Sequence, residues 1–198
     1  MGLHTEPLDQ EDQDAIILDA RSGDLESLRD IFSNLVDPKL ILTCKDADTK
    51  STPLHMAAAN GHVEVVEYLA SLVSDVSERT KWVNATNETG NTALHWASLN
   101  GKLECVQLLC DKLGADPFLR NSFDHDAIFE AERGSHDAVE TFYLQKYDVE
   151  PEAQGSDGPV EDTVQYSEGT EVEQVTKDAT EALRLETQKL SLEKEGGK

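Results

Sequence analysis

Apolar and small residues recur at helical spacing in two consecutive runs within one short stretch, at Leu94, Ala97 and Ser98 and then at Leu103, Val106, Leu109 and Cys110. The dipeptide formed by Asn100 and Gly101 separates the two runs and is a strong turn signal. The pattern therefore predicts a short helix, a tight turn and a second helix.

This helical hairpin occurs more than once. The phrase "NTALHWASLNGKLECVQLL" at 91–109 nearly matches "STPLHMAAANGHVEVVEYL" at 51–69, and fainter copies begin at residues 14 and 126. Equivalent positions in successive copies lie about 34 to 40 residues apart, which indicates a solenoid of stacked repeats. One such hairpin cannot bury its apolar face alone, so neighbouring copies must pack on each other.

A helix start with a clear physical basis stands at Thr52, directly before Pro53. The threonine oxygen can accept a hydrogen bond from a first-turn N–H, and proline at the first helical position loses no intrahelical bond. Small residues let neighbouring helices approach closely, and these are Ala57, Ala58, Ala97 and Ser98.

The motifs TPLHMAAANGH and TALHWASLNGK, together with GADPFLRN at 114–121, resemble the ankyrin-repeat family. The resemblance implies an all-α ankyrin-repeat solenoid of about four helix-turn-helix units with an acidic C-terminal extension. An N-terminal arm would span 1–11 and the repeat domain 12–147, with units at about 12–47, 48–87, 88–121 and 122–147. Residues 72–85 make the second unit longer than the usual ~33 residues, and we expect an extended helix end or a longer finger loop there, with Trp82 packed at its base.

The composition changes near residue 148. Pro, Gly, Ser and acidic residues with few large apolar ones predict an acidic linker or disordered arm over 148–169. A capping-box pattern at 170–173 then predicts a helix and tail over 170–198. The apolar stripe of that helix is thin, so docking on a surface and an isolated, marginal helix remain alternatives.

The charge limits the choice of partners. Lys and Arg total 17 against 40 Asp and Glu, for a net charge of −23. DNA, RNA and anionic membranes would be repelled, so we expect no direct nucleic-acid or membrane partner and favour a basic one. No apolar run approaches the roughly 20 residues that a bilayer requires, and the acidic N-terminus does not resemble a secretory signal.

Three cysteines without a CxxC motif predict reduced, mostly buried thiols in a cytosolic or nuclear protein, at Cys44, Cys105 and Cys110. His55 and His95 occupy the same place in two units, so a structural role explains them better than metal binding. The sequence contains neither a Gly-rich phosphate loop nor a GxSxG motif. We therefore expect a binding protein rather than an enzyme, with no catalytic residues, cofactor or metal.

Ankyrin arrays usually bind through finger tips and inner helices, so the resemblance implies partner-binding residues at Asp48, Thr49, Ser51, Asn60, Glu88, Thr89, Asn91, Trp96, Leu99, Asn100, Phe123, His125, Glu130 and Arg133. Trp96 and Phe123 are candidate aromatic anchors, although packing between units is an alternative for Trp96. Six acids fall on the same side of the aligned units, at Asp46, Asp48, Glu88, Asp124, Glu130 and Glu132. They predict either a negative groove or a generic solubilising surface.

The whole chain resembles a narrower group, including its ends outside the repeats: "MGLHTEPLDQEDQDAIILDARSGDLESL", "HDAIFEAE", "KYDVEPE" and "GTEVEQVTKDATEALRLET" are similar to small fungal ankyrin proteins that act as dedicated chaperones of small-subunit ribosomal protein three. The resemblance implies a cytoplasmic and nuclear protein, monomeric when free, that keeps a newly made basic ribosomal protein soluble and assists its nuclear delivery. An ankyrin adaptor for another client and a regulatory inhibitor of an enzyme remain alternatives.

Overall fold

The computed structural model describes residues 3–147. The linker predicted over 148–169 and the helix and tail predicted over 170–198 lie outside the described residues.

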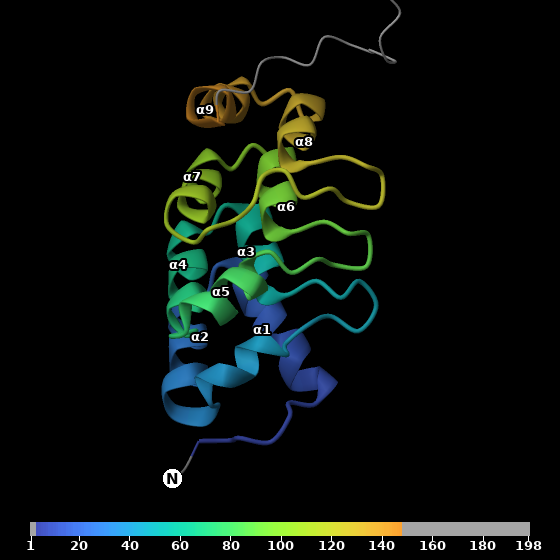
Figure 1. Ribbon diagram of the computed structural model, residues 1–198. Coiled ribbons are helices and arrows are strands. Elements are labelled where there is room, and N and C mark those ends of the chain that lie inside the picture. Colours follow the sequence, from blue (N-terminus) through green and yellow to red (C-terminus); the bar gives the residue numbers. More distant parts are fainter. Residues whose placement is uncertain (1–2, 148–198) are drawn as a thin grey trace, which may run out of the picture. The chain divides into compact units, whose positions relative to one another are not determined.

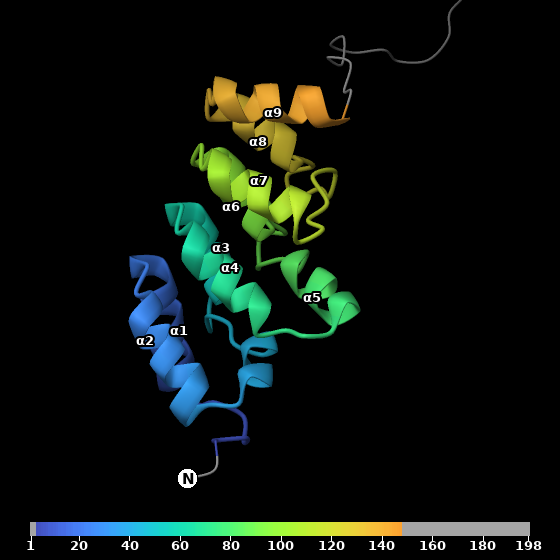
Figure 2. The same cartoon turned by 90° about the vertical axis from the view of Figure 1, so that its left-hand side faces the viewer.

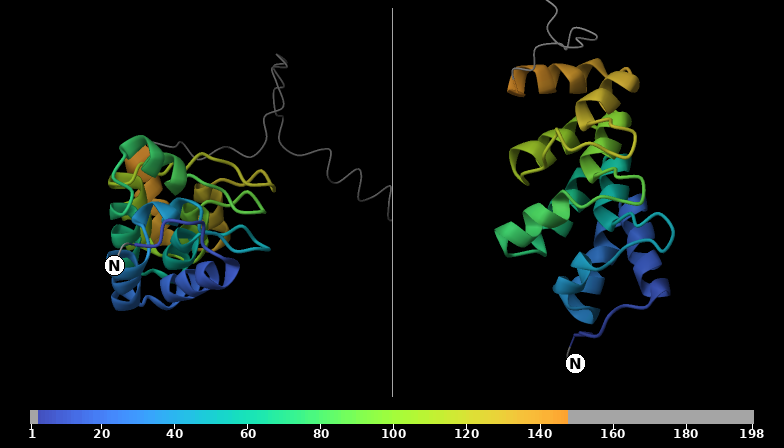
Figure 3. Two further views of the ribbon diagram at one scale, coloured as in Figure 1. Left: turned by 90° about the horizontal axis from the view of Figure 1, so that it is seen from below. Right: turned by 45° about the vertical axis from the view of Figure 1, so that its right-hand side comes forward.

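Within residues 3–147, four helical hairpins stack in chain order, and each contributes one helix to an inner row and one to an outer row (Figure 1). The inner row consists of α1 (Gln10–Ser22), α3 (Pro53–Asn60), α6 (Ala93–Leu99) and α8 (Ala127–Arg133). The outer row consists of α2 (Leu25–Asp30), α4 (Val63–Ser71), α7 (Leu103–Asp111) and α9 (Asp137–Tyr147). Seen from the end of the stack, the long loops between hairpins project together beside the inner helices (Figure 3).

The boundaries of the hairpins follow the signals in the sequence. In α6 the Thr92 hydroxyl accepts from the backbone N–H of His95 at 3.4 Å, as a capping residue should. At the end of α3, Gly61 adopts φ +85° and its N–H reaches the carbonyls of Ala57 and Ala58. Because a side chain is strained in this left-handed conformation, glycine favours a turn at this point.

The core lies between the two rows. Leu54 and Leu94 from inner helices and Val66 and Leu109 from outer helices are fully buried. The small residues predicted to allow close approach, Ala57, Ala58, Ala97 and Ser98, are also fully buried. Burial of apolar surface contributes roughly 25 cal/mol per Å², and a single hairpin cannot bury its apolar face alone, so the fold depends on the stacking of units.

The first unit is the least regular. After α2 the chain makes a π turn, η1 (Ile31–Leu35), and a 3-10 turn, η2 (Pro38–Leu42). The N-terminal arm is tied to this region because the backbone N–H of His4 donates to Leu35 O at 2.7 Å and His4 O accepts from Asp37 N at 2.8 Å. Leu8 of the arm is buried.

The insertion in the second unit forms a separate helix, α5 (Val76–Val83), which projects beside α4 and α7 (Figure 2). The expectation of an extended helix end or a longer finger loop is therefore wrong. Asp75 starts the helix by accepting from Glu78 N at 2.8 Å, and this local cap breaks the continuity with α4. Trp82 packs at the base as expected and is 4 % exposed.

The three cysteines are free, with Cys44 and Cys105 buried and Cys110 half-buried. Burial raises the pKa of Cys44 to about 12 and the pKa values of Cys105 and Cys110 to about 11. The thiolate form is therefore scarce at neutral pH, which makes these groups poor nucleophiles. Within residues 3–147 no helix is long and apolar enough to cross a membrane, and no group of His, Cys, Asp or Glu is arranged to hold a metal.

Candidate partner-binding surface

Three finger loops, at 43–51, 84–91 and 119–125, share one local hydrogen-bond pattern. A carbonyl or carboxylate Oδ1 near the start of each loop accepts from a backbone N–H two residues later. The pairs are Asp46 with Asp48 N (3.1 Å), Asn87 with Thr89 N (3.1 Å) and Asn121 with Phe123 N (2.9 Å). These internal bonds hold each finger in shape without a bound partner.

The fingers are also bonded to one another. Glu88 N donates to Thr49 O at 2.8 Å, and Ser122 N donates to Thr89 O at 3.0 Å. Gly90 makes the second contact possible, because it has φ +77° and a Cβ there would lie 2.8 Å from Ser122 N. The three loops therefore form one connected shelf beside the inner helices (Figure 1).

Two buried histidines connect consecutive units. His55 Nε2 donates to Asn91 O at 2.9 Å, and His95 Nε2 donates to His125 O at 3.1 Å. Because a carbonyl only accepts, the proton lies on Nε2 in both rings, and Nδ1 accepts from the N–H of Thr52 and of Thr92. Burial lowers the pKa of His55 to about 4 and lowers the pKa of His95. Both rings serve as neutral spacers between helices and fingers.

Several of the residues expected to bind a partner are exposed at the finger tips, and these are Asp48, Thr49, Glu88, Thr89 and Phe123. Asn60 and Asn100 are exposed at helix ends, where their amides donate to Met56 O and Trp96 O. Ser51 is different, because its side chain is buried and 1 % of the residue is exposed. It does not belong to the surface that a partner could reach.

Six of the expected residues line a single hollow of about 130 Å³ between α6, α8 and the adjoining fingers: Asn91, Trp96, Leu99, Phe123, Glu130 and Arg133. His95 and Asn121 complete its wall. We call this site the α6–α8 hollow. Trp96 is half-buried and lines this hollow.

Glu130 is the unusual member of the hollow, because only 3 % of this acidic residue is exposed. Its Oε1 accepts from Asn121 Nδ2 at 3.1 Å and from His125 Nδ1 at 3.2 Å. Its Oε2 is buried without a hydrogen-bond partner, and Nη1 of Arg133 lies 3.4 Å away. One oxygen of this buried carboxylate therefore accepts two hydrogen bonds, and the other accepts none.

Aromatic rings extend from the hollow across the third finger. The His125 ring lies 4.1 Å from the Phe129 ring and 6.2 Å from the Phe123 ring, measured between centroids. Phe123 is 64 % exposed. An aromatic side chain this exposed at the edge of a hollow is a favourable anchor for a partner.

The acids on the fingers differ in what they do. Asp46 accepts from Thr49 N and Oγ1, and these bonds lower the pKa of its carboxyl group. Asp124 pairs with Arg120 at 2.9 Å. Asp48 and Glu88 are exposed and form no salt bridge with any described residue, so their charges are available to a partner.

Sequence reasoning missed Asn87 and Asn121, which shape the second and third fingers and, in the case of Asn121, hold Glu130. A signal was present, because each asparagine stands five residues before the residue that caps the following inner helix, Thr92 or Asp126. Asparagine at such a position favours a turn.

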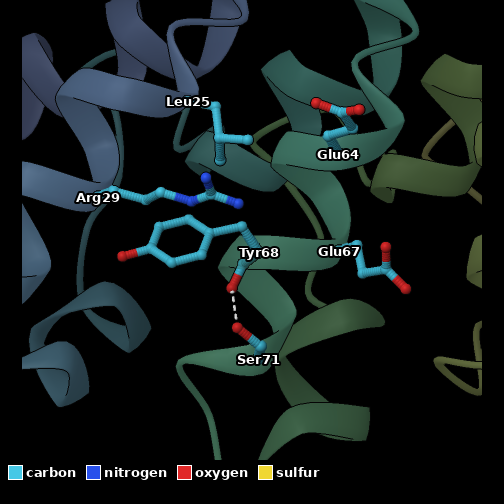
Figure 4. A pocket seen from close by; sticks show the side chains of 6 residues that line it. All are labelled: Leu25, Arg29, Glu64, Glu67, Tyr68 and Ser71. Atoms are coloured by element: carbon cyan, nitrogen blue, oxygen red, sulfur yellow. Dashed lines mark hydrogen bonds between the residues drawn. The ribbon is translucent and has the colours of Figure 1, made fainter.

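A second, more open hollow of about 550 Å³ lies on the outer row (Figure 4) and is lined by Leu25, Arg29, Glu64, Glu67, Tyr68 and Ser71. The guanidinium carbon of Arg29 lies 5.7 Å from the centre of the Tyr68 ring. No buried polar atom among its lining residues lacks a partner. The α6–α8 hollow is therefore the better candidate for specific recognition.

The fold and the fingers define a class. A family model for ankyrin repeats (three copies) matches residues 16–121, and the chain belongs to the ankyrin-repeat family. The expected all-α ankyrin solenoid is thereby confirmed.

Two matches, one to a protein sequence and one to a solved structure, are much closer than a shared fold requires. The chain is 62% identical over 200 residues to ankyrin repeat-containing protein YAR1 of Saccharomyces cerevisiae. The match covers 98% of this chain and 100% of that protein. It also matches a chain in the crystal structure of the yeast ribosomal protein Rps3 in complex with its chaperone Yar1. That match has a TM-score of 0.72 and 63% identity, over 74% of this chain and 99% of the solved one.

Proposed function

We propose that this protein is a dedicated chaperone of ribosomal protein Rps3 of the small subunit. The observation that carries the proposal is the similarity to YAR1 along the full length, at 62% identity, because a solved relative is a chaperone in complex with Rps3. A generic ankyrin adaptor would share the repeats but not the segments outside them. The protein acts by binding, with no catalytic step.

The physical chemistry of the two partners supports this function. A ribosomal protein outside the ribosome exposes a basic surface that is meant for RNA, and that surface binds other polyanions or aggregates. A chaperone with a net charge of −23 and exposed acids at Asp48 and Glu88 attracts and covers such a surface. Electrostatic steering of this kind speeds association and makes it sensitive to salt.

We further propose that this protein escorts its client. A client that is made in the cytoplasm and assembled in the nucleus needs protection throughout transit, so we place this chaperone in both compartments and assign it a role in nuclear delivery of the client and in small-subunit biogenesis. The free chaperone is a monomer whose finger shelf is open to the client.

The test uses purified yeast Rps3, whose aggregation at low ionic strength is followed by light scattering. Added at an equal molar amount, the protein should suppress scattering and form a complex of defined mass on gel filtration with multi-angle detection. A control with an unrelated acidic protein reports unspecific charge effects. Equal suppression by that control, or no complex with Rps3, would contradict the chaperone function and leave the adaptor and inhibitor alternatives.

The escort role has its own test. Depletion of the protein from cells should leave Rps3 aggregated or cytoplasmic, and re-expression should restore its nuclear signal. Unchanged delivery of Rps3 would remove the escort role and leave chaperone binding intact.

A further inference from the structure

We propose that the α6–α8 hollow is a socket for one arginine side chain of the client. This inference rests on the proposed function and deepens it, because it assigns a specific chemical group of the basic client to a specific place on the ankyrin array. The negative net charge of the protein attracts the basic client, whereas the socket determines where on the array one arginine of the client binds.

The carboxylate of Glu130 is the reason to expect a cation. Its side chain is 4 % exposed, and its Oε2 is buried without a hydrogen-bond partner. A buried polar group without a partner is costly, and a charged one more so. Asn121 and His125 hold Oε1 from one side, so the carboxylate is fixed. Oε2 is covered in the free protein, so an entering donor reaches it by displacing Arg133, which lies 3.4 Å away.

Arg133 does not fill this role in the free protein. Its Nη1 lies 3.4 Å from Oε2, its side chain is 53 % exposed, and the contact does not have hydrogen-bond geometry. Such a partly exposed ion pair is worth little. Arg133 is therefore a replaceable neighbour, and its positive charge opposes entry of a second cation into the hollow.

The other walls suit a guanidinium group. Trp96 and Phe123 line the same hollow as Glu130, and an aromatic face attracts a cation within about 6 Å. Guanidinium is planar, weakly hydrated and stacks on aromatic rings, while its N–H groups bind a carboxylate. A lysine ammonium would keep only the last of these interactions in full. A volume of about 130 Å³ fits the end of one side chain and not a folded segment.

Two substitutions at the same ion pair should change the affinity for Rps3 in opposite directions. Glu130→Gln retains size and an acceptor for Asn121 but removes the negative charge, and it should weaken binding of Rps3 by about 10- to 100-fold. Arg133→Gln removes the competing positive charge, and it should tighten binding by about 3-fold. If the ion pair only stabilised the fold, both substitutions would change the affinity for Rps3 in the same direction.

The matched control is Glu104→Gln, which removes the same charge from an exposed position on α7. It should change affinity by less than about 2-fold. All variants are compared by isothermal titration with yeast Rps3 and by thermal melting of the free chain. Loss of affinity in Glu130→Gln no greater than in Glu104→Gln would overturn the socket while leaving Rps3 binding by the parent chain intact.

A small probe tests the socket without Rps3. The chain has two tryptophans, so the indole N–H signals of Trp96 and Trp82 can be followed separately by NMR during titration with Nα-acetylarginine amide. The Trp96 signal should shift, the Trp82 signal should not, and the neutral isostere Nα-acetylcitrulline amide should have little effect. The shift should disappear in Glu130→Gln. Equal shifts with citrulline, or no shift of Trp96 with arginine, would overturn the assignment.

Discussion

His55 and Asn91 are joined across the boundary between two repeat units by a hydrogen bond of 2.9 Å from the imidazole Nε2 to the backbone carbonyl. The same ring accepts from Thr52 N at 3.2 Å, so one neutral side chain fixes both the start of α3 and the base of the next finger. Protonation of His55 would place a second N–H donor at Nδ1, facing the N–H of Thr52. The two donors would repel each other, and this hydrogen bond would be lost.

This geometry predicts a loss of stability in mild acid. The pKa of His55 falls from 6.5 to about 4 on folding because the ring is buried. The unfolded chain therefore binds more protons between these values, and the stabilisation is fully present above pH 6.5 and lost as pH falls toward 4. His55 alone accounts for about 3 kcal/mol over this range, and the lowered pKa of His95 acts in the same direction.

The measurement is urea unfolding at several pH values, together with NMR titration of the imidazole signals. His55→Gln should lower stability at pH 7 and flatten the dependence on pH between 6.5 and 5. An NMR pKa for His55 near the unperturbed value would contradict the explanation.

A second buried pair joins the last two units. The Ser98 hydroxyl on α6 lies 2.7 Å from the Tyr143 hydroxyl on α9, and both residues are fully buried. Tyr143→Phe should cost about 1–3 kcal/mol because it leaves a buried hydroxyl without a partner. The double variant Ser98→Ala with Tyr143→Phe should recover much of this loss, since both polar groups are then absent. Additive losses in denaturant titrations would show that the pair is not coupled.

The connected finger shelf depends on Gly90. Gly90→Ala should destabilise the free chain by about 1–3 kcal/mol, because alanine is strained at φ +77° and its Cβ would lie 2.8 Å from Ser122 N. Thr86→Ala, at an exposed position in the same loop, is the control and should be nearly neutral. Hydrogen exchange at Ser122 N should accelerate in Gly90→Ala, and unchanged protection there would argue against the contact between fingers.

Phe123 is predicted to bind the client without supporting the fold. It is 64 % exposed, so Phe123→Ala should leave the melting temperature nearly unchanged while weakening binding of Rps3 by about 10-fold. Val76 on α5 has the same exposed fraction but does not line the α6–α8 hollow, and Val76→Ala should affect neither quantity. Equal affinities of the two variants in titrations with Rps3 would remove Phe123 from the binding surface.

The repeat architecture was predictable because its determinants are local and recur. Each central inner helix has threonine before it, glycine after it and small residues facing the neighbouring helix. Each of these choices has a local physical reason, namely capping, turn formation and close packing. The insertion was not predictable in the same way. Whether residues 72–85 extend α4 or start a new helix depends on the cap formed by Asp75, and the repeat has no equivalent of that residue.

The binding surface was only partly predictable. The alignment of the units placed Trp96, Phe123 and Glu130 on the side of the fingers and inner helices. The structure brings the three residues together around one hollow. The burial of Glu130 on α8 and of Ser51 at the end of the first finger could not be anticipated, since glutamate and serine are mostly exposed residues. Burial depends on Asn121 and on packing between units, which a single repeat does not encode.

The most direct test of the chaperone function is the dissociation constant of the complex with purified yeast Rps3, measured by isothermal titration at low and at high salt. An acidic chaperone with a net charge of −23 that covers a basic client should form a one-to-one complex whose affinity falls by about 10-fold or more as ionic strength rises from 0.05 to 0.5 M. Binding that does not change with salt, or no binding to Rps3, would contradict the proposed function.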